Sequence, residues 1–503
     1  MSGQVLLGLV MLISMIGIIF IGFPISFTLL FMALSFGYVG LGGSTVFNLA
    51  YFQTVGMMKE ELLAAVPLFI FMGFITEQAG LMERLFIALR LLLAPIRGSL
   101  FAVVVLTATV FAMATGIVGA AVTVLGIMAA PIMIKSGYDA KLSAGAITAG
   151  GTLGILIPPS VMLIVMGPVL GVSVADLYAA AFGPGFLLAG MYLVYLLVRA
   201  FINPTLGPPV PVDERIHGAG HIIKEVLLGT LPLLGLIAAT LGSILAGLAT
   251  ATEAAAIGAF GAILLATAYG KLTYAGMKRA VLSTTATSSM VLLLATTSNI
   301  FGAVFARLGT ANWITESMLA LPLPPVAMLV VVIFLIFLLG WPFEWPAIIL
   351  VFLPIFDPVM AALRIPLGTS LGIAPDMVMV WFGALVAVTL QTAYLSPPVA
   401  MSAYYLKQVV PDWSLATIYK GMFEFMALQC IGVALIVIFP QIATWLPEHL
   451  QAERLAIKTE QVDDSVNPPE EDPAEGKQEQ TEEEEEEGKG GDALEKDEMK
   501  AKK

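Results

Sequence analysis

The chain has 503 residues, of which 58% are hydrophobic and only 12% charged, and its mean hydropathy is +0.94. Water cannot cover that much apolar surface, whereas a protein surrounded by lipid requires it. The composition therefore excludes an ordinary soluble protein and predicts an all-α polytopic membrane protein.

The net charge of −12 belongs to the C-terminal segment. Between Glu448 and Lys503 lie 20 of the 36 acidic residues and 8 of the 24 basic residues, so the remainder of the chain is neutral. This segment includes the acidic run Glu482–Glu487 and few apolar residues, which predicts a disordered, solvated tail; a docking tail is the alternative. The acidic balance consequently carries no information about a substrate. The single cysteine, Cys430, excludes a disulfide framework.

Apolar runs predict ten membrane crossings and two re-entrant hairpins. The crossings lie near 4–22, 24–42, 62–80, 142–172, 176–202, 226–249, 252–270, 283–306, 376–410 and 417–446. The hairpins, 99–134 and 325–356, are apolar segments that Gly or Pro breaks near the middle. Irregular backbone at that depth is tolerated only inside protein or beside a water-filled cavity. Apolar residues mixed with Lys or Arg predict surface helices at Leu81–Ile96 and Leu272–Leu282.

The distribution of Lys and Arg predicts the orientation. With the N-terminus outside, the inner loops carry thirteen basic residues and the outer loops three, Lys59, Arg307 and Arg364. This is a strong positive-inside bias. An even number of crossings then places the C-terminus on the same periplasmic side as the N-terminus.

A polar linker at 203–225 divides the body into two halves, 1–202 and 226–447, which the tail 448–503 follows. The halves share an order of features. Gly116 in the first hairpin corresponds to Gly340 in the second, and each hairpin is followed by an interrupted span. Because each half contains five crossings, an odd number, the second half is predicted to be an inverted repeat of the first.

The interrupted spans each contain a Pro-Pro pair, Pro158-Pro159 in 142–172 and Pro397-Pro398 in 376–410. Proline lacks an N–H group and ends a helix, so carbonyl groups one turn earlier need other partners, such as cations, water or hydroxyl groups. The half-helices that follow begin with free N–H groups, which suit a carboxylate. A single proline is usually a packing kink, but the repeated pair favours a binding site. The predicted substrate- and ion-binding residues are Thr115, Gly116, Gly119, Gly151, Thr152, Pro158, Pro159, Ser160, Gly340, Glu344, Gln391, Thr392, Ser396, Pro397 and Pro398.

The run Gly151 to Ser160 (GTLGILIPPS) resembles the large membrane subunit of tripartite ATP-independent periplasmic (TRAP) transporters. Similar segments are Pro67–Gly73, Thr252–Ala256, and Leu338–Gly340 followed by Glu344, and the resemblance covers about residues 1–447. It implies sodium-driven inward transport of a small organic acid across the bacterial inner membrane. It also implies an elevator mechanism in which a transport domain, holding both hairpins and both broken spans, moves against a scaffold.

The resemblance further implies two partners, a small four-span membrane subunit and a periplasmic substrate-binding protein, besides the lipid bilayer and the organic acid. Sodium ions are the implied coupling ions, bound by backbone carbonyls near Thr115, Thr152, Gly340 and Thr392, with no other cofactor. Many family members have a Ser-Gly-Ser run at the first hairpin tip, where this chain has Thr115-Gly116-Ile117. One hydroxyl ligand is thus replaced, and the first sodium site is expected to rely more on carbonyl groups or to be altered.

Other acidic and basic residues have weaker interpretations. Glu344 lies in an apolar hairpin, where an ionisable group is either functional or faces water. Glu253 is more simply a capping residue at a helix start, together with Thr252. Glu77 and Glu424 are lesser candidates, and Arg307 is more simply an interfacial anchor.

No phosphate-binding loop and no nucleophile–base–acid set is present, so the chain is not predicted to hydrolyse ATP or to be an enzyme, and no nucleic-acid partner is expected. The favoured hypothesis is the large permease subunit. The alternative is a stand-alone sodium/anion symporter of related inverted-repeat fold that needs no binding protein. A channel or a membrane-embedded enzyme is the third hypothesis.

Overall fold

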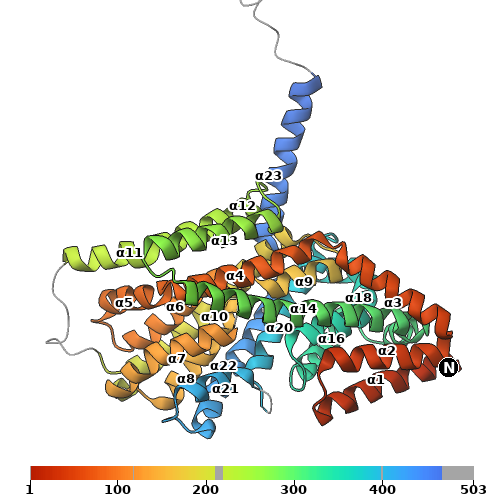
Figure 1. Cartoon of the computed structure of the whole chain (residues 1–503), viewed down its shortest axis with the longest axis horizontal. Coiled ribbons are helices and arrows are strands. Elements are labelled where there is room, and N and C mark those ends of the chain that lie inside the picture. Colours follow the sequence, from red (N-terminus) through yellow and green to blue (C-terminus); the bar gives the residue numbers. More distant parts are fainter. Residues whose placement is uncertain (1, 117, 210–218, 398–399, 467–503) are drawn as a thin grey trace, which may run out of the picture. The chain divides into compact units, whose positions relative to one another are not determined.

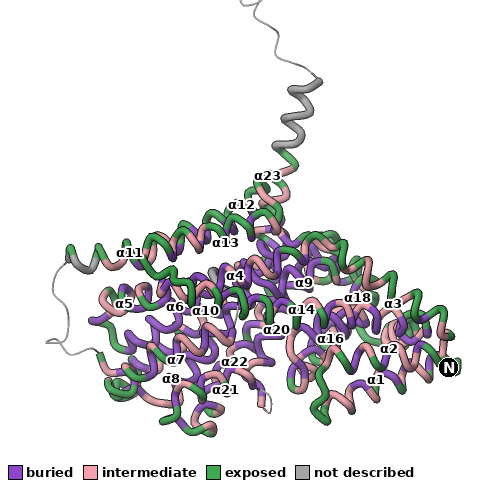
Figure 2. The backbone as a smooth tube through the Cα atoms, viewed as in Figure 1, coloured by how far each residue is buried: buried purple, intermediate pink, exposed green. Residues whose placement is uncertain are grey.

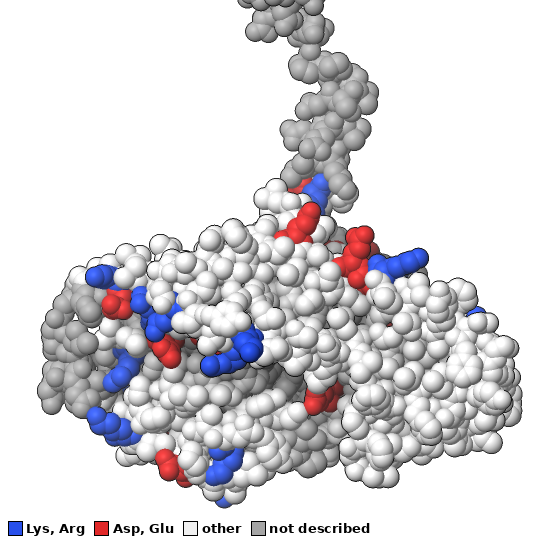
Figure 3. All heavy atoms as spheres, in the orientation of Figure 1, with Lys and Arg blue, Asp and Glu red and all other residues white. Residues whose placement is uncertain are grey.

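The computed structural model describes residues 2–116, 118–209, 219–397 and 400–466. In these residues all regular structure is helical, with no β-strand, which confirms the predicted all-α class. Ten of the described helices are long and apolar enough to cross a membrane. On the face drawn in Figure 3 charged side chains are sparse and most of the surface is uncharged, as lipid contact requires.

The helices of the first half end at residue 202 and are shown in Figure 1 in warm colours. They are α1 (Gly3–Ile21), α2 (Ile25–Leu41), α3 (Gly43–Met58), η1 (Glu61–Ala64), α4 (Ala65–Gln78), α5 (Leu81–Leu93), α6 (Ser99–Thr115), α7 (Val118–Lys135), α8 (Ala140–Thr152), η2 (Leu153–Ile155), α9 (Val161–Leu170) and α10 (Val174–Ile202).

The helices of the second half follow the linker. They are α11 (Ala219–Ile237), η5 (Ala238–Gly242), α12 (Ser243–Leu245), α13 (Ala251–Ala268), α14 (Tyr274–Arg307), α15 (Thr310–Leu319), α16 (Pro325–Leu339), α17 (Trp345–Ala347), η6 (Ile348–Phe352), α18 (Leu353–Ala362), α19 (Arg364–Leu371), α20 (Val378–Leu395), α21 (Met401–Val409), α22 (Leu415–Ile438) and α23 (Gln441–Val466).

Two sequence predictions about helices are wrong in detail. The surface helix expected at Leu272–Leu282 is not separate: its residues from Tyr274 onward belong to α14, which continues for 34 residues because no Pro interrupts it before Arg307. The segment between the second and third predicted crossings forms α3. The crossing predicted at 417–446 ends at Ile438. The next residue, Phe439, precedes Pro440, and a residue before proline disfavours the helical conformation.

The predicted disordered tail does not begin at Glu448. The chain divides into a compact unit of Met1–Glu448 and a second unit from His449, yet α23 continues as a helix to Val466. Residues after Glu448 such as Ala452 and Leu455 are strong helix formers, and His449 lies 3.5 Å from Glu453, one turn further on. The acidic run Glu482–Glu487 lies outside the described residues.

Packing within the first unit joins the two halves of the sequence. Helix α4 packs on α13, α2 on α14, and α5 on α11. Helix α8 packs on α22 at two glycines: a Cβ atom on Gly145 would lie 2.5 Å from the Phe425 ring, and one on Gly421 would lie 2.1 Å from the Lys141 carbonyl oxygen. Small residues let helices approach closely in a membrane, and they bring the first broken span against the last crossing.

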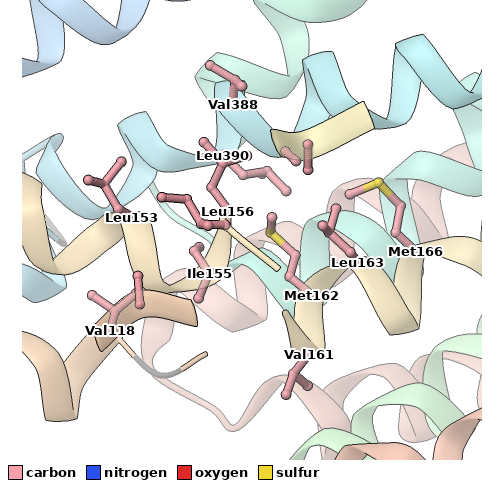
Figure 4. Packing of buried hydrophobic residues seen from close by; sticks show 14 of the residues in the cluster. Val118, Leu153, Ile155, Leu156, Val161, Met162, Leu163, Met166, Val388 and Leu390 are labelled. Carbon is pink, nitrogen blue, oxygen red and sulfur yellow. The ribbon is translucent and has the colours of Figure 1, made fainter. Parts of the chain in front are cut away.

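The two broken spans form the centre of the core. All residues from Leu142 to Thr152 are buried, and so are 94% of the residues of α20, Val378–Leu395. Figure 2 shows this concentration of buried backbone around α4, α9 and α20. Figure 4 shows Leu153 and Leu156 of the first break packed near Leu390 of α20, within one continuous apolar cluster. Little of an outer helix such as α1 is buried, so lipid contact falls to helices of that kind.

Candidate functional site

The first break separates α8 from α9. After Thr152 a 3₁₀ turn, Leu153–Ile155, leads into irregular backbone that ends where α9 begins at Val161. Pro158 and Pro159 lie in this segment and supply no N–H groups. The Ser160 hydroxyl donates to the Ile155 carbonyl, and the Tyr178 hydroxyl donates to the Ser160 carbonyl at 3.3 Å. Two of the carbonyl groups at the break thus have side-chain donors.

The second break separates α20 from α21. Helix α20 ends at Leu395, and Ala400 has a φ of +31°, a strained value for a residue with a Cβ atom. The Ser396 hydroxyl donates to the Thr392 carbonyl at 2.7 Å, and the Ala400 N–H group donates to the Ser396 carbonyl at 3.0 Å. Pro397 lies in this turn, and Pro398 lies outside the described residues.

Each hairpin tip rests against the break of its own half. Gly116 ends α6 with φ +61°, and a Cβ atom there would lie 3.3 Å from the Pro159 carbonyl oxygen. Gly340 ends α16, and a Cβ atom there would lie 3.0 Å from the Cβ of Ala393 in α20. The hairpins also cross to the opposite half, because α7 packs on α21 and η6 packs on α9.

A cavity of about 220 Å³ lies where these elements meet. Its walls come from both hairpins, both broken spans, α4 and α14. The lining residues are Ile70, Gly116, Val118, Gly119, Ile155, Val161, Thr287, Met290, Val291, Glu344, Trp345, Pro346, Tyr394, Met401 and Tyr405. This central cavity is the candidate functional site.

Four of the lining residues are the first residues of helices: Val118 of α7, Val161 of α9, Trp345 of the helix that continues through η6 to Ala362, and Met401 of α21. The N–H groups of a first helical turn have no partner within the helix, and the helix dipole adds partial positive charge. Four such ends at one cavity create an environment that favours an anion without a basic side chain.

The charge in the cavity comes from one side chain. Glu344 is the sole Asp, Glu, Lys, Arg or His among the residues that line the cavity in the described part of the chain. It stands immediately before α17 and makes no side-chain hydrogen bond to that helix. Tyr394 and Tyr405 lie close enough to Glu344 to interact with it electrostatically. These two tyrosines and Thr287 were not singled out from the sequence, since neither residue type is unusual in an apolar helix.

The other predicted site residues whose side chains the structure describes do not line the cavity. Thr152 donates to the Ala149 carbonyl at 2.8 Å and Thr392 to the Thr389 carbonyl at 2.6 Å, so both hydroxyls bond their own helices. Gly151 contacts the backbone of α7, where its Cβ atom would lie 3.1 Å from the Val122 nitrogen. The side chain of Thr115 lies outside the described residues, as does Ile117.

Gln391 differs from these residues because it has unmet hydrogen-bonding capacity. It is fully buried, and its amide nitrogen and oxygen both lack a hydrogen-bond partner in the described structure. A buried amide without partners is costly. Its position in α20, one turn before the second break, makes it a candidate for contact with a ligand or an ordered water molecule.

Glu253 and Glu424 have structural roles. Thr250, not Thr252, is the N-cap of α13, and Glu253 completes a reciprocal capping box with it. Glu424 of α22 pairs with Lys141 of α8, and it accepts a hydrogen bond from the Tyr195 hydroxyl of α10 at 2.5 Å. Arg199 extends this network, with Nη1 2.6 Å from the Tyr195 oxygen and 3.6 Å from Glu424. The network ties together α8, α10 and α22.

Two interrupted helices and two hairpins around a small central cavity define a multi-pass membrane transporter. Residues 12–442 match the family described as tripartite ATP-independent periplasmic transporter, DctM component. The chain belongs to this family, whose large permease proteins are transporters and not enzymes, and the resemblance seen in its motifs is thereby confirmed.

Several characterised permeases are similar along nearly their whole length. The sialic acid TRAP transporter large permease SiaM of Vibrio cholerae is 31% identical over 86% of this chain and 96% of its own. The C4-dicarboxylate permease DctM of Pseudomonas aeruginosa is 28% identical over 78% and 87%, respectively. The ectoine permease TeaC of Halomonas elongata is 25% identical over 87% and 98%.

Two solved structures have a similar fold at low sequence identity. The YdaH transporter of Alcanivorax borkumensis has a TM-score of 0.55 at 17% identity and covers 81% of this chain and 90% of its own. MtrF of Neisseria gonorrhoeae has a TM-score of 0.54 at 14% identity and covers 79% and 84%. At these identities the likeness concerns the fold alone.

Proposed function

We propose that this chain is the translocating subunit of a sodium-coupled transporter that carries a small organic acid into the cell across the bacterial inner membrane. The observation that carries the proposal is the meeting of four helix N-termini at one cavity of about 220 Å³. Partial positive charges and free N–H groups suit a carboxylate. The names of the relatives, which include C4-dicarboxylate and sialic acid permeases, support the same class of solute.

Sodium coupling is supported by the opposite ends of the interrupted helices. At the first hairpin tip the carbonyl oxygens of Gly154 and Pro159 face Gly116, within 3.9 Å and 3.3 Å of a Cβ atom built there. Backbone carbonyls at broken helices are the groups that bind Na⁺ in transporters with such helices. The proposal therefore places sodium sites near Thr115 and Thr152 in the first half and near Gly340 and Thr392 in the second.

An inverted repeat is supported by the symmetry of the packing. Exchanging the halves turns the pair α4–α13 into α14–α2, the pair α8–α22 into α20–α10, and the pair α7–α21 into α18–α9, and all six contacts exist. In the proposed elevator the hairpins and broken spans move together against α1–α5 and α11–α15. N- and C-termini on the periplasmic side follow from the distribution of basic residues.

The proposed partners are a small four-span membrane subunit and a periplasmic binding protein that delivers the acid. The test is uptake into proteoliposomes that contain the chain and both partners, with an organic acid that the binding protein binds. An inward sodium gradient should drive accumulation, and its removal should abolish it. Accumulation that is independent of sodium contradicts coupling. Accumulation by the chain without a binding protein supports the stand-alone symporter instead.

A further inference from the structure

We propose that the preferred solute is a carboxylate that also carries a hydrogen-bond donor, a hydroxyl or ammonium group, and that Glu344 selects it over a dicarboxylate. This inference rests on the proposed function and adds a chemical class to it. Its basis is the contrast inside the central cavity, where four anion-favouring helix ends face one acidic side chain.

The position of Glu344 makes its carboxylate available to a ligand. The side chain lines the cavity and is only partly buried. It makes no hydrogen bond to the helix that it precedes, and among the described residues it forms no ion pair. An ionised carboxylate accepts hydrogen bonds and donates none. A solute in the cavity therefore meets an acceptor that needs a donor.

The same carboxylate disfavours a second negative charge on the solute. In a cavity of about 220 Å³ both ends of a four-carbon dicarboxylate would share the space with Glu344, and no Lys, Arg or His lines the described walls. Two carboxylates at close range repel each other. The helix N-termini offset one negative charge on the solute, whereas a hydroxyl or ammonium group can donate to Glu344 in a charge-assisted hydrogen bond.

The neighbouring tyrosines complete a polar corner. Tyr394 of α20 and Tyr405 of α21 both lie within electrostatic reach of Glu344, and Tyr405 also touches the first hairpin, since a Cβ atom on Gly119 would lie 3.0 Å from its ring. A phenol both donates and accepts. The corner therefore suits a hydroxyl group better than an apolar chain end.

The test uses the purified full-length chain in sodium-containing buffer and four-carbon probes: butyrate, its monohydroxylated isomers, 4-aminobutyrate and succinate. Binding is measured by the shift in unfolding temperature and by quenching of tryptophan fluorescence, because Trp345 lines the cavity. A hydroxylated or amino probe is expected to bind about tenfold or more tightly than butyrate and succinate, since one charge-assisted hydrogen bond is worth that factor.

The variants separate selection from simple structural support. Glu344→Gln should reduce the preference for the donor-bearing probe over succinate by about tenfold, because the bond becomes neutral and the repulsion disappears. The sodium concentration for half-maximal binding should stay unchanged. Glu83→Gln is the matched control, since Glu83 is an exposed acid on α5, away from the cavity.

Each contrary result has a distinct meaning. Succinate that binds wild-type protein as tightly as the best donor-bearing probe overturns the inference, as does a Glu344→Gln variant that weakens all probes equally or only shifts the sodium dependence. These outcomes leave the proposed function intact. The absence of any sodium-dependent binding or uptake of an organic acid by the wild-type transporter would instead remove the proposed function, and this inference with it.

Discussion

At the scale of single residues, the site depends on positions where the backbone leaves the helical conformation. Gly116 adopts a left-handed conformation against the Pro159 carbonyl, and Ala400 adopts one with a side chain. Strained backbone persists where the surrounding structure enforces it and often accompanies function. Substitutions at such positions should affect transport more than their size suggests.

Gly116→Ala is expected to impair both folding stability and uptake. The new Cβ atom would lie 3.3 Å from a carbonyl oxygen, and a left-handed alanine costs about 1–2 kcal/mol. The measurements are the unfolding temperature of the purified chain and initial uptake rates. Gly190→Ala, in α10 with open space around the added atom, is the control and should leave uptake unchanged. Normal uptake by Gly116→Ala would argue against a tight hairpin tip.

Gln391→Leu is expected to raise stability and lower uptake. Leucine removes a buried amide without partners, whose burial costs about 1–3 kcal/mol. If the amide contacts a ligand or an ordered water molecule during transport, the more stable protein is slower. Thermal unfolding in the absence of sodium and substrate, alongside uptake at saturating substrate, checks both parts. Lower stability together with normal uptake would assign Gln391 to packing.

Much of this residue-scale organisation could be predicted from the sequence, because Pro and Gly act locally. A proline interrupts a helix regardless of the tertiary packing around it, so the proline pairs indicate where the spans break. Gly116 and Gly340 end their helices, as the repeat suggested. Tyr394 and Tyr405 could not be found in this way. Their importance arises from the approach of α20 and α21 to the hairpins, and tertiary packing of that kind leaves no local pattern in a uniformly apolar sequence.

At the scale of elements, charged contacts hold the first broken span in place. Glu424 receives Lys141 and Tyr195 from two other helices, with Arg199 nearby. Partly exposed ion pairs contribute little singly, but removal of the shared carboxylate leaves two cations unpaired. The sequence ranked Glu424 as a minor candidate, because its partners are 229 and 283 positions away.

Glu424→Gln should therefore lower the stability of the chain by about 1 kcal/mol or more, while the affinity of the central cavity for substrate changes little. The readouts are the unfolding temperature and substrate binding measured side by side. Glu316→Gln, an exposed acid on α15, is the control with no expected effect. A strong loss of affinity without loss of stability would place Glu424 in the binding site.

At the scale of the whole molecule, the proposed mechanism requires movement between groups of helices. A second cavity, of about 370 Å³, lies between α3 and α14 on one side and α9 and η6 on the other. Val165 of α9 and Ala295 of α14 both line it. In the proposed elevator Val165 belongs to the transport domain and Ala295 to the scaffold, so the distance between them changes during transport.

Cross-linking Val165→Cys to Ala295→Cys in a Cys430→Ala background should stop uptake, and a cleavable linker should allow recovery on reduction. The sequence has one native cysteine, so the background needs a single substitution. Met72→Cys with Gly258→Cys is the matched control, because a Cβ atom on Gly258 lies 2.5 Å from the Met72 sulfur and both helices belong to the scaffold. Unimpaired uptake by the Val165–Ala295 cross-link would exclude the movement.

The four helix starts around the cavity have a consequence for how such a permease diversifies. The potential that attracts a carboxylate belongs to backbone N–H groups, which every amino acid except proline supplies, so side-chain substitutions other than those to proline leave it in place. The side chains of Val118, Val161, Thr287 and Met401 line the cavity, so substitutions there change its size and polarity. Saturation mutagenesis of these four positions should yield permeases with altered solute preference that still require an acid group. The requirement arises from the backbone at the helix starts and not from the side chains.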